Sequence, residues 1–288
     1  MTSRDVRPFL VSAAESSSNP DAAVANFERW VAATSTPTTY FDSLAAAPAM
    51  GRIIVSLLGA SHQLSNVLVQ NPEIAALVFD TELLQTLPDP CELDRELVSL
   101  LANANNYSHA LDRLRYFKQS WLLRIAACDL AGLWEEEQVW RALSDVADVL
   151  VARAASVVWS DIAGHEDCPV SIIAMGKLGG RELNFSSDID LVFVLADSAK
   201  EEEERPATKF AEAMSRALSD RMGRGALYRV DLRLRPYGGK GELTPRAGAV
   251  DDRQARVLRA VSRRVDGAQH DLPQLELEAV GQRVVGVL

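Results

Sequence analysis

The residues best suited to chemistry are two aspartates, Asp188 and Asp190, which are separated by one residue at the start of the apolar run DIDLVFVL (188–195). Side chains two residues apart in a β-strand project from the same face, so both carboxylates can share metal ions. A third carboxylate, Asp231, would complete a site for two Mg²⁺ or Mn²⁺ ions if its segment forms a neighbouring strand. An Asp-x-Asp pair alone also occurs in ordinary acidic surface turns, so the prediction depends on the surrounding pattern.

A glycine-containing stretch, GKLGGRELNFSS (176–187), directly precedes the two aspartates. It contains neither GxGxxG nor GxxxxGK[ST], which excludes the usual dinucleotide-binding turn and the P-loop. We expect Gly179 and Gly180 to open a short helix whose free backbone N–H groups can bind a phosphate. Ser187 joins them as a candidate for nucleotide binding. The alternative is a plain turn between two strands.

The segment ALYRVDLRLRPYGGKGEL (226–243) alternates between two classes of side chain for nine residues, which predicts a strand. Arg233 and Arg235 are candidates for binding an attacking inorganic phosphate, because guanidinium groups bind phosphate through paired N–H donors. The structural alternative is that these arginines pair with Asp231 or neighbouring acids. The expected polar face comprises Leu227, Arg229, Asp231, Arg233 and Arg235, and the apolar face comprises Tyr228, Val230, Leu232 and Leu234.

Apolar periodicity predicts the elements that position these residues. Short, nearly continuous apolar runs predict strands at 170–175 and 188–195, buried on both faces of a sheet. Apolar side chains at three- and four-residue spacing predict helices within 51–80, 108–130, 135–159 and 206–223. We expect the basic residues of the second helix to be solvated surface residues, namely Arg115, Lys118 and Arg124.

The order of these elements predicts an α+β fold with about two domains in 288 residues. We expect a helical domain in 1–130, a small mixed sheet flanked by helices in 131–248, and a divergent tail in 249–288. The tail has no Phe, Tyr or Trp and carries five arginines between Arg253 and Arg264. It is expected to be either a short amphipathic helix with an unstructured end or the product of a changed reading frame.

Charge and composition exclude several classes of protein. The net charge of −10 argues against a broad electrostatic contact with nucleic acid. The three cysteines, Cys91, Cys128 and Cys168, form no CxxC pair suited to zinc or redox chemistry. No apolar run approaches the roughly 20 residues that span a bilayer, and the first residues lack a signal peptide pattern. We therefore expect a cytoplasmic protein that binds neither nucleic acid nor membranes.

The motifs together resemble a known family. The stretch GKLGGRELNFSSDIDL (176–191), followed by DLRLRPYGGKGEL (231–243), resembles the glutamine synthetase adenylyltransferase family, whose catalytic domains are similar to polymerase-beta-type nucleotidyltransferases. LLGASHQLSNVLVQNPE (57–73) and LRYFKQSWLLRIAACDL (114–130) are similar to its amino-terminal helical region, so the resemblance runs from about residue 50 to 243. It implies that Asp188, Asp190 and Asp231 bind metal and that Gly179 and Gly180 hold nucleotide phosphates.

The family's chains carry two such catalytic domains, and RELNFSSDID resembles the one that removes AMP from a tyrosine of glutamine synthetase. The resemblance implies phosphorolysis of the tyrosyl–AMP bond, with Mg²⁺ or Mn²⁺ as cofactor, adenine nucleotide (ATP or ADP) and phosphate as reactants, and glutamine synthetase as partner. Past about Arg246 the chain departs from the family pattern, so it should lack the adding activity. Two alternatives stay open: a nucleotidyltransferase acting on a small molecule or tRNA, and a non-catalytic fragment that binds glutamine synthetase or a PII-type signalling protein.

Overall fold

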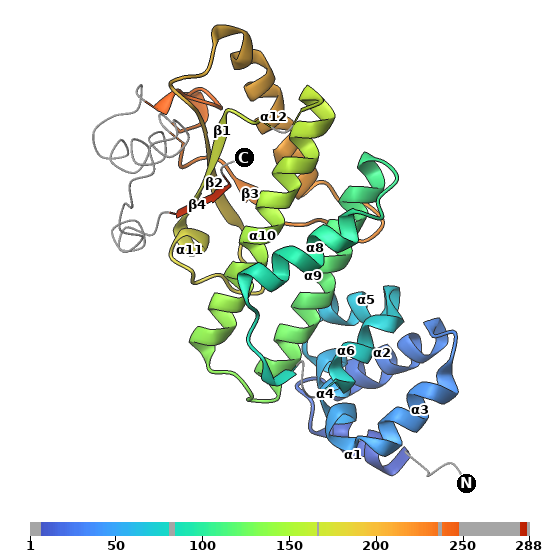
Figure 1. The fold of residues 1–288 in the computed structure, drawn as a ribbon. Helices are drawn as coiled ribbons and strands as arrows, with labels where there is room; N and C mark the ends of the chain where they lie inside the picture. Colours follow the sequence, from blue (N-terminus) through green and yellow to red (C-terminus); the bar gives the residue numbers. More distant parts are fainter. Residues whose placement is uncertain (1–6, 81–83, 166, 236–237, 248–282, 287–288) are drawn as a thin grey trace. The chain divides into compact units, whose positions relative to one another are not determined.

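The chain divides into two units in this computed structural model, which describes residues 7–80, 84–165, 167–235, 238–247 and 283–286. One unit contains the described residues of Met1–Leu87 and Gln119–Val139, and the other contains those of Pro88–Lys118 and Trp140–Leu288. Two long helices, α9 (Tyr107–Leu130) and α10 (Glu136–Ala163), contribute residues to both units (Figure 1). The domain limits that we expected, with a boundary at residue 130, stay a prediction.

The first unit is helical, and prolines begin several of its helices. Proline suits the first helical turn, where its missing N–H would have no partner and its φ is already helical. The aromatic ring of Trp30 is fully buried, with the rings of Phe27 and Tyr40 at centroid distances of 5.7 and 5.0 Å. The elements are α1 (Arg7–Glu15), α2 (Pro20–Ala33), α3 (Pro37–Ala46), α4 (Pro48–Ala60), α5 (His62–Gln70), the 3₁₀ helix η1 (Pro72–Ala75) and α6 (Ala76–Phe79).

The periodic region 51–80 is divided into α4, α5, η1 and α6. Ser61 ends α4 and caps α5, because its extended backbone frees its side chain to accept from the N–H of Gln63. Asn71 and Pro72 interrupt the pattern again. The predicted core side chains are nevertheless buried, namely Ile54, Leu57, Leu58, Leu64, Val67 and Leu68.

The second unit contains a four-stranded mixed sheet with the order β3-β2-β1-β4. Its strands are β1 (Val170–Met175), β2 (Ile189–Leu195), β3 (Val230–Asp231) and β4 (Arg283–Gly286). β1 pairs antiparallel with β2 and β4, whereas β3 runs parallel to β2. The apolar runs of β1 and β2 are almost entirely buried, which confirms the two strands and the α+β class predicted from the sequence.

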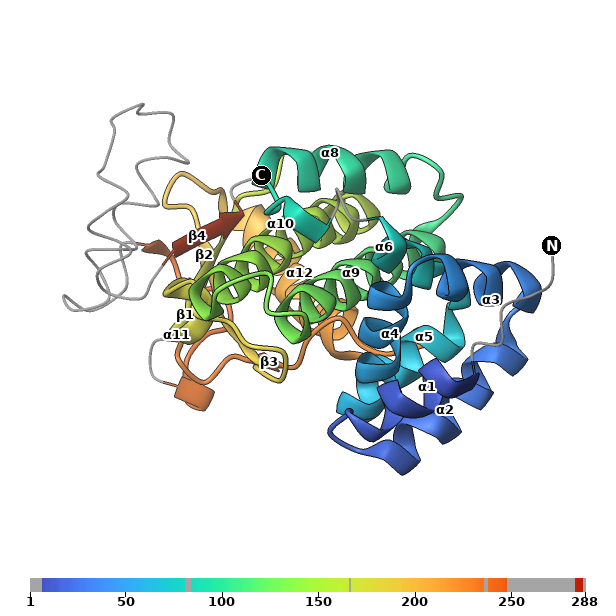
Figure 2. The same cartoon turned by 90° about the horizontal axis from the view of Figure 1, so that it is seen from below.

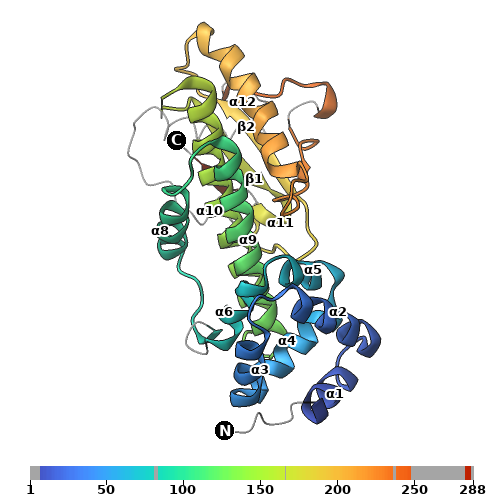
Figure 3. The same ribbon diagram turned by 90° about the vertical axis from the view of Figure 1, so that its right-hand side faces the viewer.

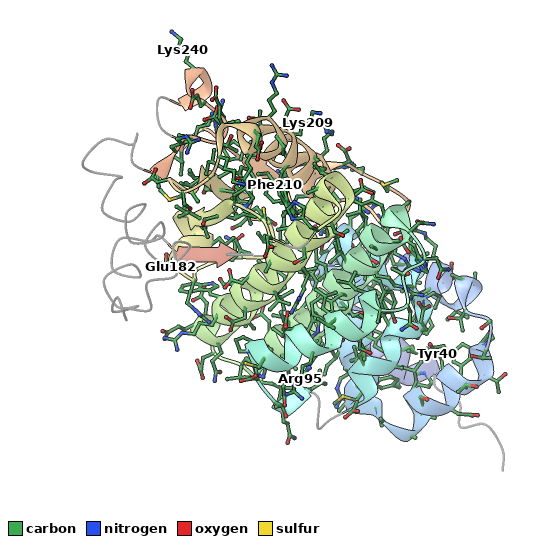
Figure 4. The ribbon with its side chains drawn as sticks, turned by 45° about the horizontal axis from the view of Figure 1, so that its top comes forward. Tyr40, Arg95, Glu182, Lys209, Phe210 and Lys240 are labelled. Atoms are coloured by element: carbon green, nitrogen blue, oxygen red, sulfur yellow. The ribbon has the colours of Figure 1, made fainter. Side chains whose placement is uncertain are left out.

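Helices α10 and α12 (Glu201–Ser219) lie on one face of this sheet (Figures 1 and 2). The ring of Phe210 on α12 packs against Trp159 of α10 and Phe193 of β2, with centroid distances of 5.7 and 6.1 Å. Phe210 turns toward this core, whereas the neighbouring Lys209 points away from it (Figure 4). The unit also contains α8 (Pro90–Leu101), α11 (Gly176–Gly179) and the 3₁₀ helix η2 (Gly238–Lys240).

Two sequence predictions, one about a strand and one about the exposure of arginines on α9, were wrong. The nine-residue strand expected over 227–235 is reduced to Val230–Asp231, because the chain turns immediately after Asp231. Arg115 and Arg124 are only 2% and 6% exposed rather than solvated. The periodic pattern of α9 is correct for its apolar residues, but it cannot show that long cationic side chains lie beneath neighbouring segments.

The predicted tail, 249–288, falls mostly outside the described residues. Arg283–Gly286 is the described part, and it pairs with β1 as the edge strand β4, which the sequence did not predict. Before it, Ala247 and Thr244 are buried, and the backbone N–H of Leu195 donates to the carbonyl of Pro245 at 3.0 Å. The fold therefore continues to residue 247. Within the described residues no single helix is long and apolar enough to cross a membrane, although the bent pair α3 and α4 passes that test together.

Candidate functional site

The strand register brings two of the three predicted aspartates face to face. Asp190 is the partner of Asp231 across the parallel pair β2–β3, and of Met175 across the antiparallel pair β1–β2. Paired residues on neighbouring strands project from the same face of a sheet, so the two carboxylates share one surface. Asp188 lies one residue before β2 and is exposed.

The turn after β1 is shaped around the carboxylate of Asp190. Gly176 has a φ of +56°, a left-handed conformation that disfavours any side chain. A Cβ atom at Gly176 would also collide with Oδ2 of Asp190. The backbone and the carboxylate can approach this closely only because residue 176 is glycine. Sequence reasoning did not select Gly176, although it directly follows the last strand residue and precedes the glycine pair.

The acids act on one another electrostatically. Burial raises the pKa of Asp190, and the negative charges of Asp231 and Asp188 raise it further. Hydrogen bonds from the side chain and backbone of Arg233 lower the pKa of Asp231. The pKa of Arg233 is raised first by its hydrogen bond to Asp231, and the charges of Asp188 and Asp190 add to this. The three carboxylates and one guanidinium therefore form a single charge cluster.

Arg233 holds Asp231 through both its side chain and its backbone. Its Nε lies 2.8 Å from Oδ2 and 3.0 Å from Oδ1 of Asp231, and its Nη2 also contacts Oδ2. Its backbone N–H donates to Oδ1 at 2.8 Å, which closes the turn that ends β3. The Arg233 side chain is 85% exposed while that of Asp231 is 14% exposed. The arginine thus lies over the more buried carboxylate from the solvent side.

Carboxylate oxygens are suitable ligands for Mg²⁺ or Mn²⁺. Burial is the main cause of the raised pKa of Asp190, and the charges of Asp231 and Asp188 add to it; a bound cation would favour the charged form against both. In the part of the chain that the structure describes, no three Asp, Glu, His or Cys side chains are arranged to hold a metal ion. Arg233 supplies the positive charge at Asp231 instead. The metal-binding role of Asp188, Asp190 and Asp231 therefore stays a prediction.

The glycine pair closes a short helix rather than opening one. α11 begins at Gly176, and Gly180 follows its last residue. The backbone N–H of Gly180 donates to the carbonyl of Gly176 at 2.9 Å, so this N–H already has a partner. Gly179 is buried within the helix. The Ser187 hydroxyl donates to Oδ1 of Asn184 at 2.8 Å and so stabilises the loop that leads into β2.

Arg235 is bound to its own loop. Its guanidinium donates to the carbonyls of Leu232 at 3.0 Å, Gly239 at 3.1 Å and Gly241 at 3.3 Å. These contacts hold the segment after β3 beside the candidate site. They give Arg235 a structural part in this conformation, and its phosphate-binding role stays a prediction.

Two contacts that the sequence did not indicate position the loop between α11 and β2. Arg181 forms an ion pair with Asp145 of α10, and the backbone N–H of Leu183 donates to Oγ of Ser144 at 3.3 Å. Arg181 itself has a φ of +59°, so the loop reverses sharply at this point. Side chains on α10 therefore fix the segment that carries the chain toward Asp188.

Lys118 positions the segment before β3. Its Nζ donates to the carbonyl of Leu227 and lies 4.2 Å from the ring centroid of Tyr228. Burial lowers the pKa of Lys118 to about 8. A buried ammonium with a backbone acceptor and an aromatic face restricts the path of residues 227–228, which lead directly to Asp231. Its position on α9 gave no indication of this contact.

Comparison with known proteins places this chain beside one group of enzymes. Residues 52–259 match the family described as glutamate-ammonia ligase adenylyltransferase. Three curated relatives are each named bifunctional glutamine synthetase adenylyltransferase/adenylyl-removing enzyme. The protein of Mesorhizobium japonicum is 30% identical over 82% of this chain and 25% of its own length. The protein of Burkholderia mallei is 37% identical over 71% of this chain and 22% of its own length. The protein of Chromobacterium violaceum is 33% identical over 82% of this chain and 27% of its own length. The chain thus spans about a quarter of the length of these relatives.

Proposed function

Because the chain belongs to the glutamate-ammonia ligase adenylyltransferase family, we propose that it is a nucleotidyltransferase unit that acts on glutamine synthetase. The observation that carries this proposal is the register that pairs Asp190 with Asp231 beside the glycine turn at Gly176. Facing carboxylates on neighbouring strands suit a reaction at a phosphoryl group, where charge must be neutralised by a cation. The adenine nucleotide is the proposed substrate or product, and the cytoplasm is the proposed location.

The direction that we propose is removal of AMP. An oxygen of inorganic phosphate attacks the phosphorus of the tyrosine-bound AMP, and the bond from that phosphorus to the tyrosine oxygen breaks. The tyrosine oxygen takes up a proton, which leaves ADP and free tyrosine. The stretch RELNFSSDID resembles the AMP-removing domain of the family, which supports this direction over the addition of AMP.

Each residue of the site has a separate role in the proposed reaction. Asp188, Asp190 and Asp231 would hold Mg²⁺ or Mn²⁺, which stabilises the charge that develops on the phosphoryl group. The close approach of Gly176 to Asp190 keeps that carboxylate in one place. Arg233 can exchange Asp231 for the incoming phosphate, because it is largely exposed and guanidinium binds both oxyanions through paired donors.

The proposal is tested by incubating the purified chain with adenylylated glutamine synthetase, phosphate and Mg²⁺ and measuring ADP. We expect ADP from the parent chain and its loss in Asp190→Asn. Asp167→Asn is the matched control, since Asp167 is exposed and precedes the opposite end of β1. ADP formation that survives Asp190→Asn would refute the assignment of this carboxylate. Absence of ADP from a folded parent chain would favour the non-catalytic alternative.

A second experiment concerns Arg233. If it binds the attacking phosphate, Arg233→Lys should raise the phosphate concentration needed for half-maximal ADP formation, because lysine lacks the paired donors. The apparent affinity for adenylylated glutamine synthetase should change less. An unchanged phosphate dependence together with lower stability would leave Arg233 with its structural pairing to Asp231 alone.

A further inference from the structure

The strand β3 is too short to fix its own register with β2. Two residue pairs join the strands, Ile189 with Val230 and Asp190 with Asp231. Register is weakly specified where a strand buries little of either face, and both residues of β3 are only half-buried. A slip by one residue turns every side chain of a strand to the opposite face of the sheet. Such a slip would carry Asp231 away from Asp190, so the register needs support from outside the strand pair.

Two helices hold the segment just before β3. The backbone N–H of Tyr228 donates to the carbonyl of Leu218 on α12 at 2.9 Å. The Nζ of Lys118 on α9 donates to the carbonyl of Leu227 and lies 4.2 Å from the ring centroid of Tyr228. Figure 3 shows α9 beside the carboxyl end of α12, which Arg115 contacts. The chain is therefore fixed at two consecutive residues, 227 and 228, shortly before β3 begins.

Lysine is an unfavourable residue for the place that Lys118 occupies. The residue is half-buried, and burial of its ammonium lowers its pKa to about 8. An apolar side chain of similar length would fill the same space without this desolvation penalty. A polar group that lowers stability in this way can still specify one register over another, as a single polar residue does in the core of a coiled coil. A slip by one residue would move the Leu227 carbonyl by roughly 3.3 Å, out of hydrogen-bond reach of Nζ.

Two further hydrogen bonds connect this fixed segment to β2. The backbone N–H of Ile189 donates to the carbonyl of Arg229 at 2.9 Å. The guanidinium of Arg229 donates to the carbonyl of Ser186 at 2.8 Å, in the loop that leads into β2. Both bonds belong to the observed register, since they join residue 229 to the start of β2. Because Arg229 directly follows Tyr228, the position set by Lys118 reaches β3 within two residues.

We propose that Lys118 is a positioning residue that selects the register of β3 and so keeps Asp231 opposite Asp190. Its consequence for metal binding rests on the proposed function, whereas the register itself does not. The competing explanation is that the methylene stem of Lys118 only packs on the Tyr228 ring, and that the backbone bond of Tyr228 sets the register. The hydrogen bond from Nζ to Leu227 separates the two explanations. Lys118→Met removes this bond and keeps a long side chain.

The test is the methyl–methyl NOE between Ile189 and Val230, measured in the methyl-labelled chain without metal. We expect this NOE in the parent chain and its loss in Lys118→Met. Lys209→Met is the matched control, because Lys209 is exposed and points away from the core (Figure 4). Val158→Ala, which shortens a buried side chain of α10, controls for lower stability alone. In a separate titration, Mn²⁺ should bind about 10–100-fold more weakly to Lys118→Met than to the parent chain, the usual effect of losing a residue that orients a metal ligand.

An unchanged NOE between Ile189 and Val230 in Lys118→Met would overturn the proposal, and so would an equal loss of this NOE in Val158→Ala. If Lys118→Met does not fold, the parent chain decides. There the Lys118 ammonium protons should exchange slowly with water and show an NOE to the Tyr228 ring, and rapid exchange would refute the hydrogen bond and the proposal with it. A parent chain that loses the NOE between the strands in Lys118→Met but binds no Mn²⁺ would support the role of Lys118 and refute the proposed function.

Discussion

Replacing Gly176 by alanine tests whether the turn after β1 is built around the carboxylate of Asp190. Two costs combine at this position. The left-handed backbone, with φ +56°, costs a non-glycine residue about 1–2 kcal/mol. The new Cβ would also collide with Oδ2 of Asp190, and a side chain forced off its rotamer costs about 0.5–1.5 kcal/mol. We therefore expect Gly176→Ala to lower the free energy of unfolding by about 2–3 kcal/mol.

The structure provides a control for the backbone cost alone. Gly225 has a φ of +84°, and a Cβ added there would meet no atom within 4 Å, so Gly225→Ala should cost only about 1–2 kcal/mol. Urea unfolding followed by circular dichroism measures both losses. In an Asp190→Ala background the collision disappears, and Gly176→Ala should then cost no more than Gly225→Ala. An equal cost of Gly176→Ala in both backgrounds would refute the reasoning.

Three other predictions concern the supports of the site and the core. The pKa of Lys118 is about 8 in the folded chain and 10.5 ordinarily. Below pH 8 the amine is protonated in the folded and in the unfolded chain, whereas between pH 8 and 10.5 it is protonated mainly in the unfolded chain. The free energy of unfolding of the parent chain should therefore rise by up to about 3 kcal/mol from pH 8 to 10.5, and Lys118→Met should abolish that rise. Parallel pH profiles of the parent chain and Lys118→Met in urea unfolding would contradict this. Asp145→Asn should lower the free energy of unfolding by about 1–3 kcal/mol because it leaves Arg181 without its carboxylate, whereas Asp167→Asn should have almost no effect. A thiol reagent should label exposed Cys91 at once in the native chain, and Cys128 and Cys168 only after unfolding. The latter two thiols are buried, which raises the pKa of Cys128 to about 11 and that of Cys168 to about 12. Rapid labelling of all three cysteines in the native chain would contradict this.

Apolar periodicity was sufficient for the long elements. β1, β2, α9 and α10 occupy the ranges expected from their runs of buried side chains, and α12 starts earlier, at the acidic run that favours a helix amino terminus. The alternating segment around Asp231 predicted too long a strand, because alternation cannot show where a strand stops pairing with its neighbour. There the Asp231 side chain accepts from the backbone of Arg233 and turns the chain. A local side-chain contact of this kind competes with the strand and has no periodic signal.

The sequence indicated the carboxylates of the candidate site, but it did not indicate the residues that hold the surrounding loops in place. Asp190 and Asp231 were expected on neighbouring strands, and the register of β2 with β3 pairs them. The closeness of Gly176 to Asp190 depends on the register of β1 with β2, and the ion pair of Arg181 with Asp145 depends on how α10 packs. Both are contacts between residues distant in the sequence, which periodicity does not show. The burial of Arg115 depends likewise on the packing of α9 against the end of α12.

The central claim is that Asp188, Asp190 and Asp231 form a cation-dependent site for nucleotidyl transfer. Its most direct test is a titration of the labelled chain with Mn²⁺, measured by the paramagnetic broadening of backbone amide resonances. We predict saturable broadening centred on residues 188–190 and 231 in the parent chain and in Asp167→Asn, and its loss in Asp190→Asn. Broadening that is absent from the parent chain, or that is unchanged by Asp190→Asn, would contradict the claim.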